Sequence, residues 1–112
     1  MIENFELKIV NSVPKKTELA KYIVPPSGTR VKIFEFVAEA AYTNLSEIRI
    51  VWDYEGANEE LLWVIRGSNV FTKVIIIDSQ EVDGVKKLAL VCDNGEKKDM
   101  NMAAIMVGVL ES

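Results

Sequence analysis

The chain has 112 residues, of which 49% are hydrophobic and 27% charged, a size and composition that fit one domain with a single core. Its formal net charge of −4 and its scattered lysines argue against nucleic-acid binding, and no apolar run approaches the roughly 18 residues of a membrane helix. The absence of histidine and the single cysteine, Cys92, exclude an internal disulfide, a Cys/His zinc site and a His-based catalytic triad.

The N-terminal segment, residues 1–25, contains two candidate strands. Phe5–Val10 alternates apolar and polar residues, which is typical of a half-buried strand. Thr17–Val24 is compatible with a strand or with one short helix, and its position before Pro25 favours an extended chain. We expect no signal peptide, because Glu3 and Glu6 lie where positive charge and a long apolar region would be needed.

A turn at Pro25-Pro26-Ser27-Gly28 precedes a long predicted strand, Arg30–Tyr42. One parity of this strand is more apolar from Phe34 onward, so we expect it to face the core. Its members are Lys32, Phe34, Phe36, Ala38 and Ala40.

The next pattern, Ser46–Tyr54 followed by Glu60–Arg66, predicts a hairpin around the turn Glu55-Gly56-Ala57-Asn58. A shift of one residue in register would turn every side chain to the other face, so burial of the apolar set selects one register. In that register both tryptophans share the inner face. The expected opposite pairs are Trp52 with Leu61, Ile50 with Trp63, and Ile48 with Ile65.

Two further apolar runs, Phe71–Ile77 and Leu88–Cys92, flank a polar segment that contains Asp83-Gly84. Because Asp-Gly between strand-like runs is a strong hairpin signal, we expect a long central hairpin here. A turn at Asn94-Gly95 leads to a last strand, Met102–Leu110, which is apolar on both sides.

About eight short strands without βαβ alternation predict an all-β fold, an antiparallel β-sandwich of jelly-roll type. An immunoglobulin-like sandwich is the nearest alternative, but a single cysteine cannot form its characteristic inter-sheet disulfide. We expect one domain over residues 1–112, with residues 1–25 as a candidate N-terminal arm.

No combination of residues predicts catalysis, so we expect neither an enzyme nor a bound metal or cofactor. Cys92 alternates with Leu88 and Leu90, which indicates a buried structural thiol. The acidic loop Asp53–Glu60 offers oxygen ligands but lacks the ordered spacing of a calcium-binding EF-hand loop.

Tyr42 and Tyr54 lie near the ends of predicted strands and are the candidate ligand-facing aromatic residues. Exposed aromatic rings stack on sugars, so a carbohydrate-binding module that recognises a polysaccharide is the alternative function.

Several strands carry apolar residues on both parities, whereas an isolated sandwich of this size should have polar outer faces. Large exposed apolar patches usually mark an interface, so we expect self-assembly, with a trimer as the first hypothesis. The predicted oligomer or partner interface consists of Val64, Val74, Ile76, Val91, Met102, Met106 and Leu110.

Two stretches, Val24–Ile33 and Asp83–Val91 followed by Asn94, resemble small β-sandwich proteins of tailed bacteriophages, in particular jelly-roll capsid decoration (cement) proteins and related tail modules. This resemblance implies a non-enzymatic virion component, made in the host cytoplasm, that reinforces a phage surface in many copies. The implied partners are further copies of the chain and a major capsid or tail protein, with no role for nucleic acid or membrane. The resemblance assigns no functional residue.

Overall fold

The computed structural model describes residues 1–39, 45–66, 68–71 and 74–112. Within these residues the chain forms nine β-strands and one short 3-10 helix. The elements are β1 (Ile2–Val13), β2 (Thr17–Ile23), β3 (Arg30–Glu39), β4 (Ser46–Trp52), β5 (Glu60–Ile65), β6 (Ser68–Phe71), β7 (Ile75–Ile77), η1 (Ser79–Glu81), β8 (Leu88–Asn94) and β9 (Met100–Glu111).

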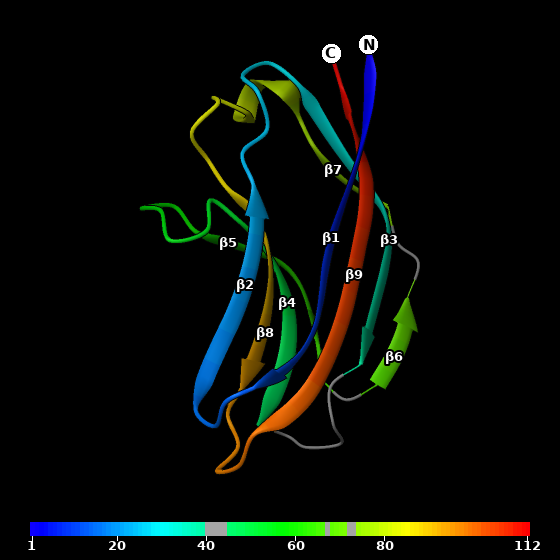
Figure 1. Ribbon diagram of the computed structural model, residues 1–112. Coiled ribbons are helices and arrows are strands. Elements are labelled where there is room, and N and C mark those ends of the chain that lie inside the picture. Colours follow the sequence, from blue (N-terminus) through cyan, green and yellow to red (C-terminus); the bar gives the residue numbers. More distant parts are fainter. Residues whose placement is uncertain (40–44, 67, 72–73) are drawn as a thin grey trace.

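The strands form two antiparallel sheets that pack face to face, as Figure 1 shows. Sheet A has the order β1-β9-β3-β6, and β7 also pairs with β3. Sheet B has the order β2-β8-β4-β5. The two chain ends lie together, because the Met1 and Ser112 backbones exchange hydrogen bonds of 3.2 and 3.0 Å.

The pairing is nested, with β1 on β9, β2 on β8, β3 on β6 and β7, and β4 on β5. Because β6 and β7 pair with successive parts of β3, they occupy one strand position, and the sandwich has eight positions. A long antiparallel ribbon that is folded over in this way is a jelly roll. The predicted all-β, antiparallel sandwich of about eight strands is therefore confirmed.

Residues 1–25 are part of this sandwich in the same chain. β1 pairs with β9 along its whole length, and β2 pairs with β8 from Thr17 to Ile23. The strand interpretation of Thr17–Val24 is confirmed, and the expectation of an N-terminal arm is wrong, because the segment supplies an edge strand to each sheet.

The predicted central hairpin is wrong, because β7 lies in sheet A and β8 lies in sheet B. Residues 78–87 cross between the sheets and place Val82 in the core with 3% of its surface exposed. The Asp83 carboxylate accepts hydrogen bonds from the backbone N–H groups of Val85 and Lys86, at 2.9 and 3.0 Å. Asp-Gly therefore shapes a turn within a crossover loop, which has the same local chemistry as a hairpin turn.

The side of β3 that faces the core changes along the strand. Val31 and Ile33 are fully buried at its start, and Phe36 and Ala38 are buried at its end. A β-bulge between Ile33 and Glu35 inserts Phe34 and switches the parity. The expected core parity is confirmed at Phe36 and Ala38 and is wrong at Lys32 and Phe34. Ala40 lies outside the described residues.

The β4–β5 hairpin has the predicted register over most of its length, with Ile48 opposite Ile65 and Ile50 opposite Trp63. A bulge after Ile50 then pairs Trp52 with Glu60 instead of Leu61. Trp52 is 2% exposed and Trp63 packs against the core, so the shared inner face of the two tryptophans is confirmed.

One polar residue closes an end of the core. Asn94 is fully buried and its amide donates to the carbonyl oxygens of Val13 and Lys98, at 2.9 and 2.8 Å. Its side-chain oxygen accepts from the N–H of Glu96 at 2.9 Å. All the polar atoms of this buried side chain are thus hydrogen-bonded, and none is left unpaired. Through these bonds Asn94 connects the end of β1 to the β8–β9 turn.

Candidate interaction surface

Three of the seven predicted interface residues, Met102, Met106 and Leu110, lie in the core, with exposed fractions of 2%, 0% and 8%. Their assignment to an interface is wrong. Their face of β9 points inward, where Ala104 lies opposite Ile9 and Met106 lies opposite Leu7. Both faces of β9 are apolar, so the sequence pattern did not reveal which one the opposite sheet would cover.

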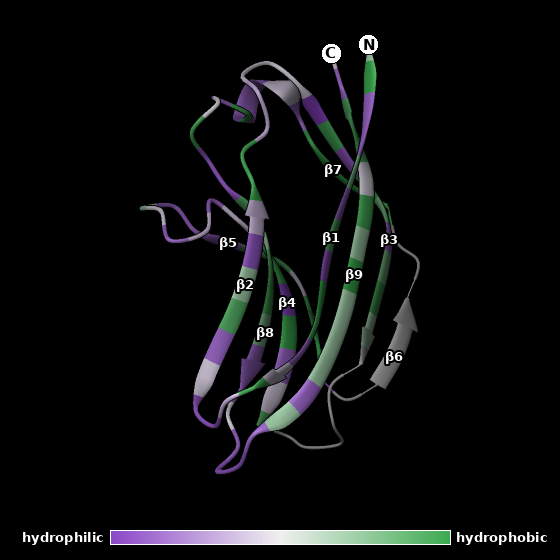
Figure 2. Ribbon diagram, viewed as in Figure 1, coloured by the Kyte–Doolittle hydropathy of each residue, from purple (hydrophilic) through white to green (hydrophobic). Residues whose placement is uncertain are grey.

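The other face of β9 points away from the core and presents four apolar side chains, which we call the β9 stripe. All four are half-buried. They are Ala103, Ile105, Val107 and Val109. Figure 2 shows that most of β9 has apolar colouring, apart from a hydrophilic band near its start. The outer face of sheet A is therefore an apolar strip on a long central strand.

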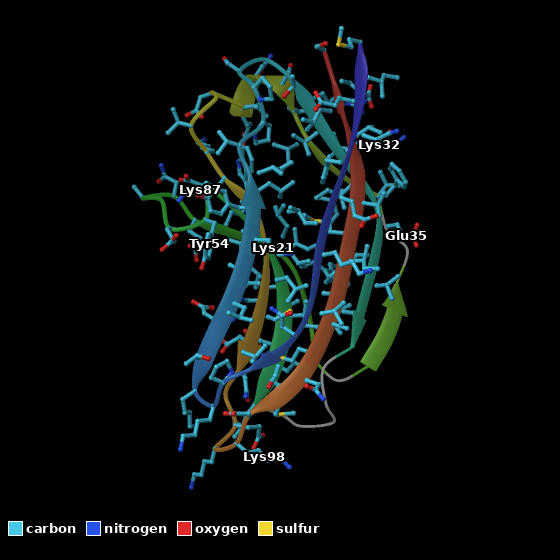
Figure 3. The ribbon with its side chains drawn as sticks, in the orientation of Figure 1. Lys21, Lys32, Glu35, Tyr54, Lys87 and Lys98 are labelled. Carbon is cyan, nitrogen blue, oxygen red and sulfur yellow. The ribbon has the colours of Figure 1, made fainter. Side chains whose placement is uncertain are left out.

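Charged and apolar residues of β1 and β3 border this stripe. On β1, Lys8 lies opposite Ile105 and Glu6 lies opposite Val107. On β3, Glu35 lies opposite Val107 and Lys32 lies opposite Val109. In Figure 3, Lys32 and Glu35 project from sheet A on the side of the molecule opposite to Tyr54 and Lys87.

The other four predicted interface residues have different settings, and one of them is fully buried. Ile76 is 44% exposed and lies opposite Lys32, so it extends the outer face of sheet A, and Val74 beside it is 53% exposed. Val64 is half-buried on β5, one of the two edge strands of sheet B. Val91 points outward from sheet B but is fully buried, because Tyr54 and Ala20 pack against the cluster that it forms with Val51 and Ala89. Its assignment to an interface is therefore also wrong.

The outer face of sheet B carries an ion network centred on Arg49. Its guanidinium donates to Glu18 at 2.6 Å, to Glu47 at 2.7 Å and to Asp93 at 2.8 Å. Arg66 reaches the other oxygen of Glu47 at 2.9 Å. These residues come from β2, β4 and β8 and from the end of β5, so the network crosses the whole sheet.

The pKa shifts in this network show that its positive and negative side chains stabilise each other in their charged forms. Burial raises the pKa of Glu47, but the hydrogen bonds and charges of Arg49 and Arg66 outweigh burial and place it below its usual value. Burial alone would lower the pKa of Arg49. The hydrogen bonds to Asp93 and Glu47 and the negative charge of Glu18 outweigh burial and raise this pKa well above its usual value. Sheet B therefore pairs its outer charges within the chain.

The described aromatic residues do not form an open sugar-binding platform. Tyr42 lies outside the described residues. Tyr54 is half-buried against the Val51 cluster, and burial together with nearby carboxylates raises the pKa of its hydroxyl. Tyr22 is 49% exposed, but the ammonium group of Lys87 lies 4.5 Å from the centre of its ring.

The acidic loop Asp53–Glu60 uses its carboxylates to fix its own backbone. The Asp53 carboxylate accepts from the N–H of Asn58 at 3.1 Å, and Glu59 accepts from the N–H of Glu55 at 2.8 Å. In the part of the chain that the structure describes, no three acidic or thiol side chains are close enough to hold a metal ion. These carboxylates thus have a structural role in shaping the loop.

Cys92 lies in the core between the two sheets and is fully buried. Burial raises the pKa of its thiol to about 11, so the thiol is protonated at neutral pH. Its environment is that of a small apolar residue, as the alternation with Leu88 and Leu90 predicted. None of the described residues forms a helix that could cross a membrane.

No protein-family model matches this chain, and no curated protein sequence matches it. Among solved structures, the chain is similar to one described as "Bacillus endospore appendages form a novel family of disulfide-linked pili". The TM-score is 0.46 and the sequence identity 10%, and the alignment covers 99% of this chain and 89% of the other.

Proposed function

We propose that this protein is a non-enzymatic structural component that works in many copies and attaches through the outer face of sheet A. The observation that carries this proposal is the β9 stripe, an apolar strip at the centre of one outer face. The outer face of sheet B differs, because its charges are paired with one another across four strands. One face is therefore suited to stay in water and the other to bind a protein surface.

The energy available from the stripe favours weak contacts repeated many times. Full burial of a Val or Ile side chain is worth roughly 1.5–3 kcal/mol, and these side chains are already half-buried. Association costs are commonly estimated at about 4–15 kcal/mol. A single pair of stripes is thus only marginally stable, and copies gain avidity when they dock side by side on a preformed surface.

The finer proposal is that this surface is the capsid or tail of a tailed bacteriophage. The jelly-roll topology agrees with the resemblance to decoration proteins in residues Val24–Ile33 and Asp83–Val91. A capsid or tail offers many identical binding sites side by side, and contacts that are weak one by one become strong together on such a lattice.

A charge placed on the stripe should prevent assembly without unfolding the chain. Ile105→Lys is expected to stay monomeric at concentrations where the natural chain forms larger species in sedimentation velocity. Val85→Lys is the matched control, because Val85 is 76% exposed on the loop before β8. If Ile105→Lys assembles as the natural chain does, the outer face of sheet A is not the attachment surface.

The virion location has its own test. Antibodies raised against the purified chain should label capsids or tails, in electron micrographs, of particles released from cells that carry the gene. Particles without label, together with antigen that remains in the soluble fraction, would contradict a virion component.

A further inference from the structure

We infer that the outer edge of β5 binds an extended segment of another protein as an added strand, with a lysine or arginine of that segment at the Glu60 end. This site is separate from the outer face of sheet A, so the inference goes beyond the proposed function and does not depend on it. Three features support it: an unpaired strand edge, a groove along that edge, and carboxylates without an ion partner at one end of the groove.

β5 is an edge strand of sheet B and pairs with β4 on one side. The N–H and C=O groups on the other side of an edge strand are available to a further strand. Charged side chains commonly discourage such pairing, and β1, an edge strand of sheet A, carries Glu6 and Lys8. Between Glu60 and Arg66, β5 carries no charge, because residues 61–65 are all apolar. β5 is therefore suited to accept a strand.

A groove follows this edge in two compartments. The apolar compartment, of about 250 Å³, is lined by consecutive residues of β5, which are Leu61, Leu62, Trp63 and Val64. The acidic compartment, of about 210 Å³, lies between β5 and the β7–η1 segment. Leu62 lines both compartments, so they are neighbours. Together they extend along the edge of β5 as a receptor for the side chains of an added strand.

The apolar side chains of the groove are partly open to water. Leu61 is 54% exposed and Val64 is half-buried in the apolar compartment. Ile76, which lines the acidic compartment, is 44% exposed. Val64 and Ile76 are two of the residues that the sequence predicted at an interface. Apolar side chains of an added strand would cover this surface, which favours a segment with alternating apolar residues.

Three carboxylates line the acidic compartment: Glu60, Asp78 and Glu81. All three are exposed, and none forms an ion pair with any residue that the structure describes. Among the described residues, no three such side chains are close enough together to hold a metal ion. A long, flexible lysine or arginine side chain therefore complements this end of the groove.

The indole N–H of Trp52 gives a further indication of an occupant. Trp52 lines the acidic compartment and is 2% exposed. Among the described residues, its N–H has no hydrogen-bond partner. Buried polar groups are nearly always hydrogen-bonded. The backbone carbonyl groups of an added segment are acceptors of the kind that this N–H lacks.

The direction of the segment follows from the geometry of strand pairing. Antiparallel pairing is slightly more stable per residue than parallel pairing. Because β5 begins at Glu60, a segment antiparallel to it has its C-terminal end beside Glu60. We therefore expect the basic residue at the C-terminal end of the segment, after the alternating apolar residues.

A synthetic peptide, acetyl-TVTVTK-amide, tests this site. Trp52 and Trp63 line the two compartments and are the two tryptophans of the chain, so the peptide should change their fluorescence in a saturable way. The same peptide with proline as its third residue keeps the charge but cannot pair as a strand, and it should not bind. Equal binding of both peptides would exclude strand addition. No saturable change with either peptide would overturn the site.

Charge exchange tests the position of the basic residue. Glu81→Lys replaces an exposed carboxylate of the acidic compartment, so it should weaken binding of the lysine peptide about tenfold. It should also favour a peptide that ends in glutamate instead of lysine. Glu3→Lys is the matched control, because it makes the same change of charge at an exposed position on β1, and it should bind the lysine peptide as the natural chain does. Equal weakening in both variants would mean that net charge attracts the peptide and that the acidic compartment does not hold its lysine.

Discussion

Replacing Leu88 by Ala should lower the free energy of unfolding by about 2–5 kcal/mol, the usual cost of removing a large buried aliphatic side chain. Leu88 is fully buried at the start of β8, an inner strand of sheet B. It lies opposite Ile23 on one side and Trp52 on the other. Truncation leaves a cavity between these neighbours, and backbone pairing on both sides restricts its collapse.

Urea denaturation followed by tryptophan fluorescence measures this loss. Val85→Ala is the control, since Val85 is only three residues away but 76% exposed, and it should change stability by less than about 0.5 kcal/mol. A comparable loss in both variants would show that the burial of Leu88 is not what stabilises this part of the fold.

Replacing Arg49 by Met should lower the free energy of unfolding at neutral pH by about 1–3 kcal/mol. Methionine keeps most of the length of the side chain but removes the donor that Glu18, Glu47 and Asp93 share. The Arg49 side chain is 20% exposed, whereas Glu18 and Asp93 are 44% and 36% exposed. Water therefore screens part of the loss, which places it below the cost of breaking a fully buried pair.

The effect of Arg49→Met should depend on pH. The pKa of Glu47 is lowered in the folded protein, so its stabilising contribution is present above its usual pKa and is lost as the pH falls through the lowered value. In the variant the clustered carboxylates repel one another until they are protonated. The difference in stability between the two proteins should thus be largest near pH 7 and shrink below about pH 4.

Urea titrations at pH 7 and near pH 3.5 check this expectation. Arg30→Met is the control, because among the residues that the structure describes Arg30 has a single ion partner, Glu111 at 3.5 Å, and its side chain is 43% exposed. That variant should show a small loss with little pH dependence. An Arg49→Met loss of equal size at both pH values would mean that lost packing, and not lost charge, is responsible.

The sequence by itself determined the fold class and much of the local pairing. Alternation in Phe5–Val10 and Ser46–Tyr54 identified strands, and the spacing around Gly56 gave the pairs Ile48–Ile65 and Ile50–Trp63. These features depend on neighbours in sequence, where period-two burial and turn chemistry act directly. The buried Cys92 followed from the same alternation.

Only the tertiary structure decided which strands share a sheet and which apolar face is the outer one. Asp83-Gly84 forms the same local turn in a hairpin and in a crossover loop, so it could not reveal that β7 and β8 belong to different sheets. The bulge at Phe34 reversed the parity of β3, and no residue type there marks it. On β9 both faces are apolar, so the pattern does not tell which face is buried. The pairing of β9 with β1 on one side and β3 on the other directs Met106 toward sheet B and leaves Ile105 on the outer face.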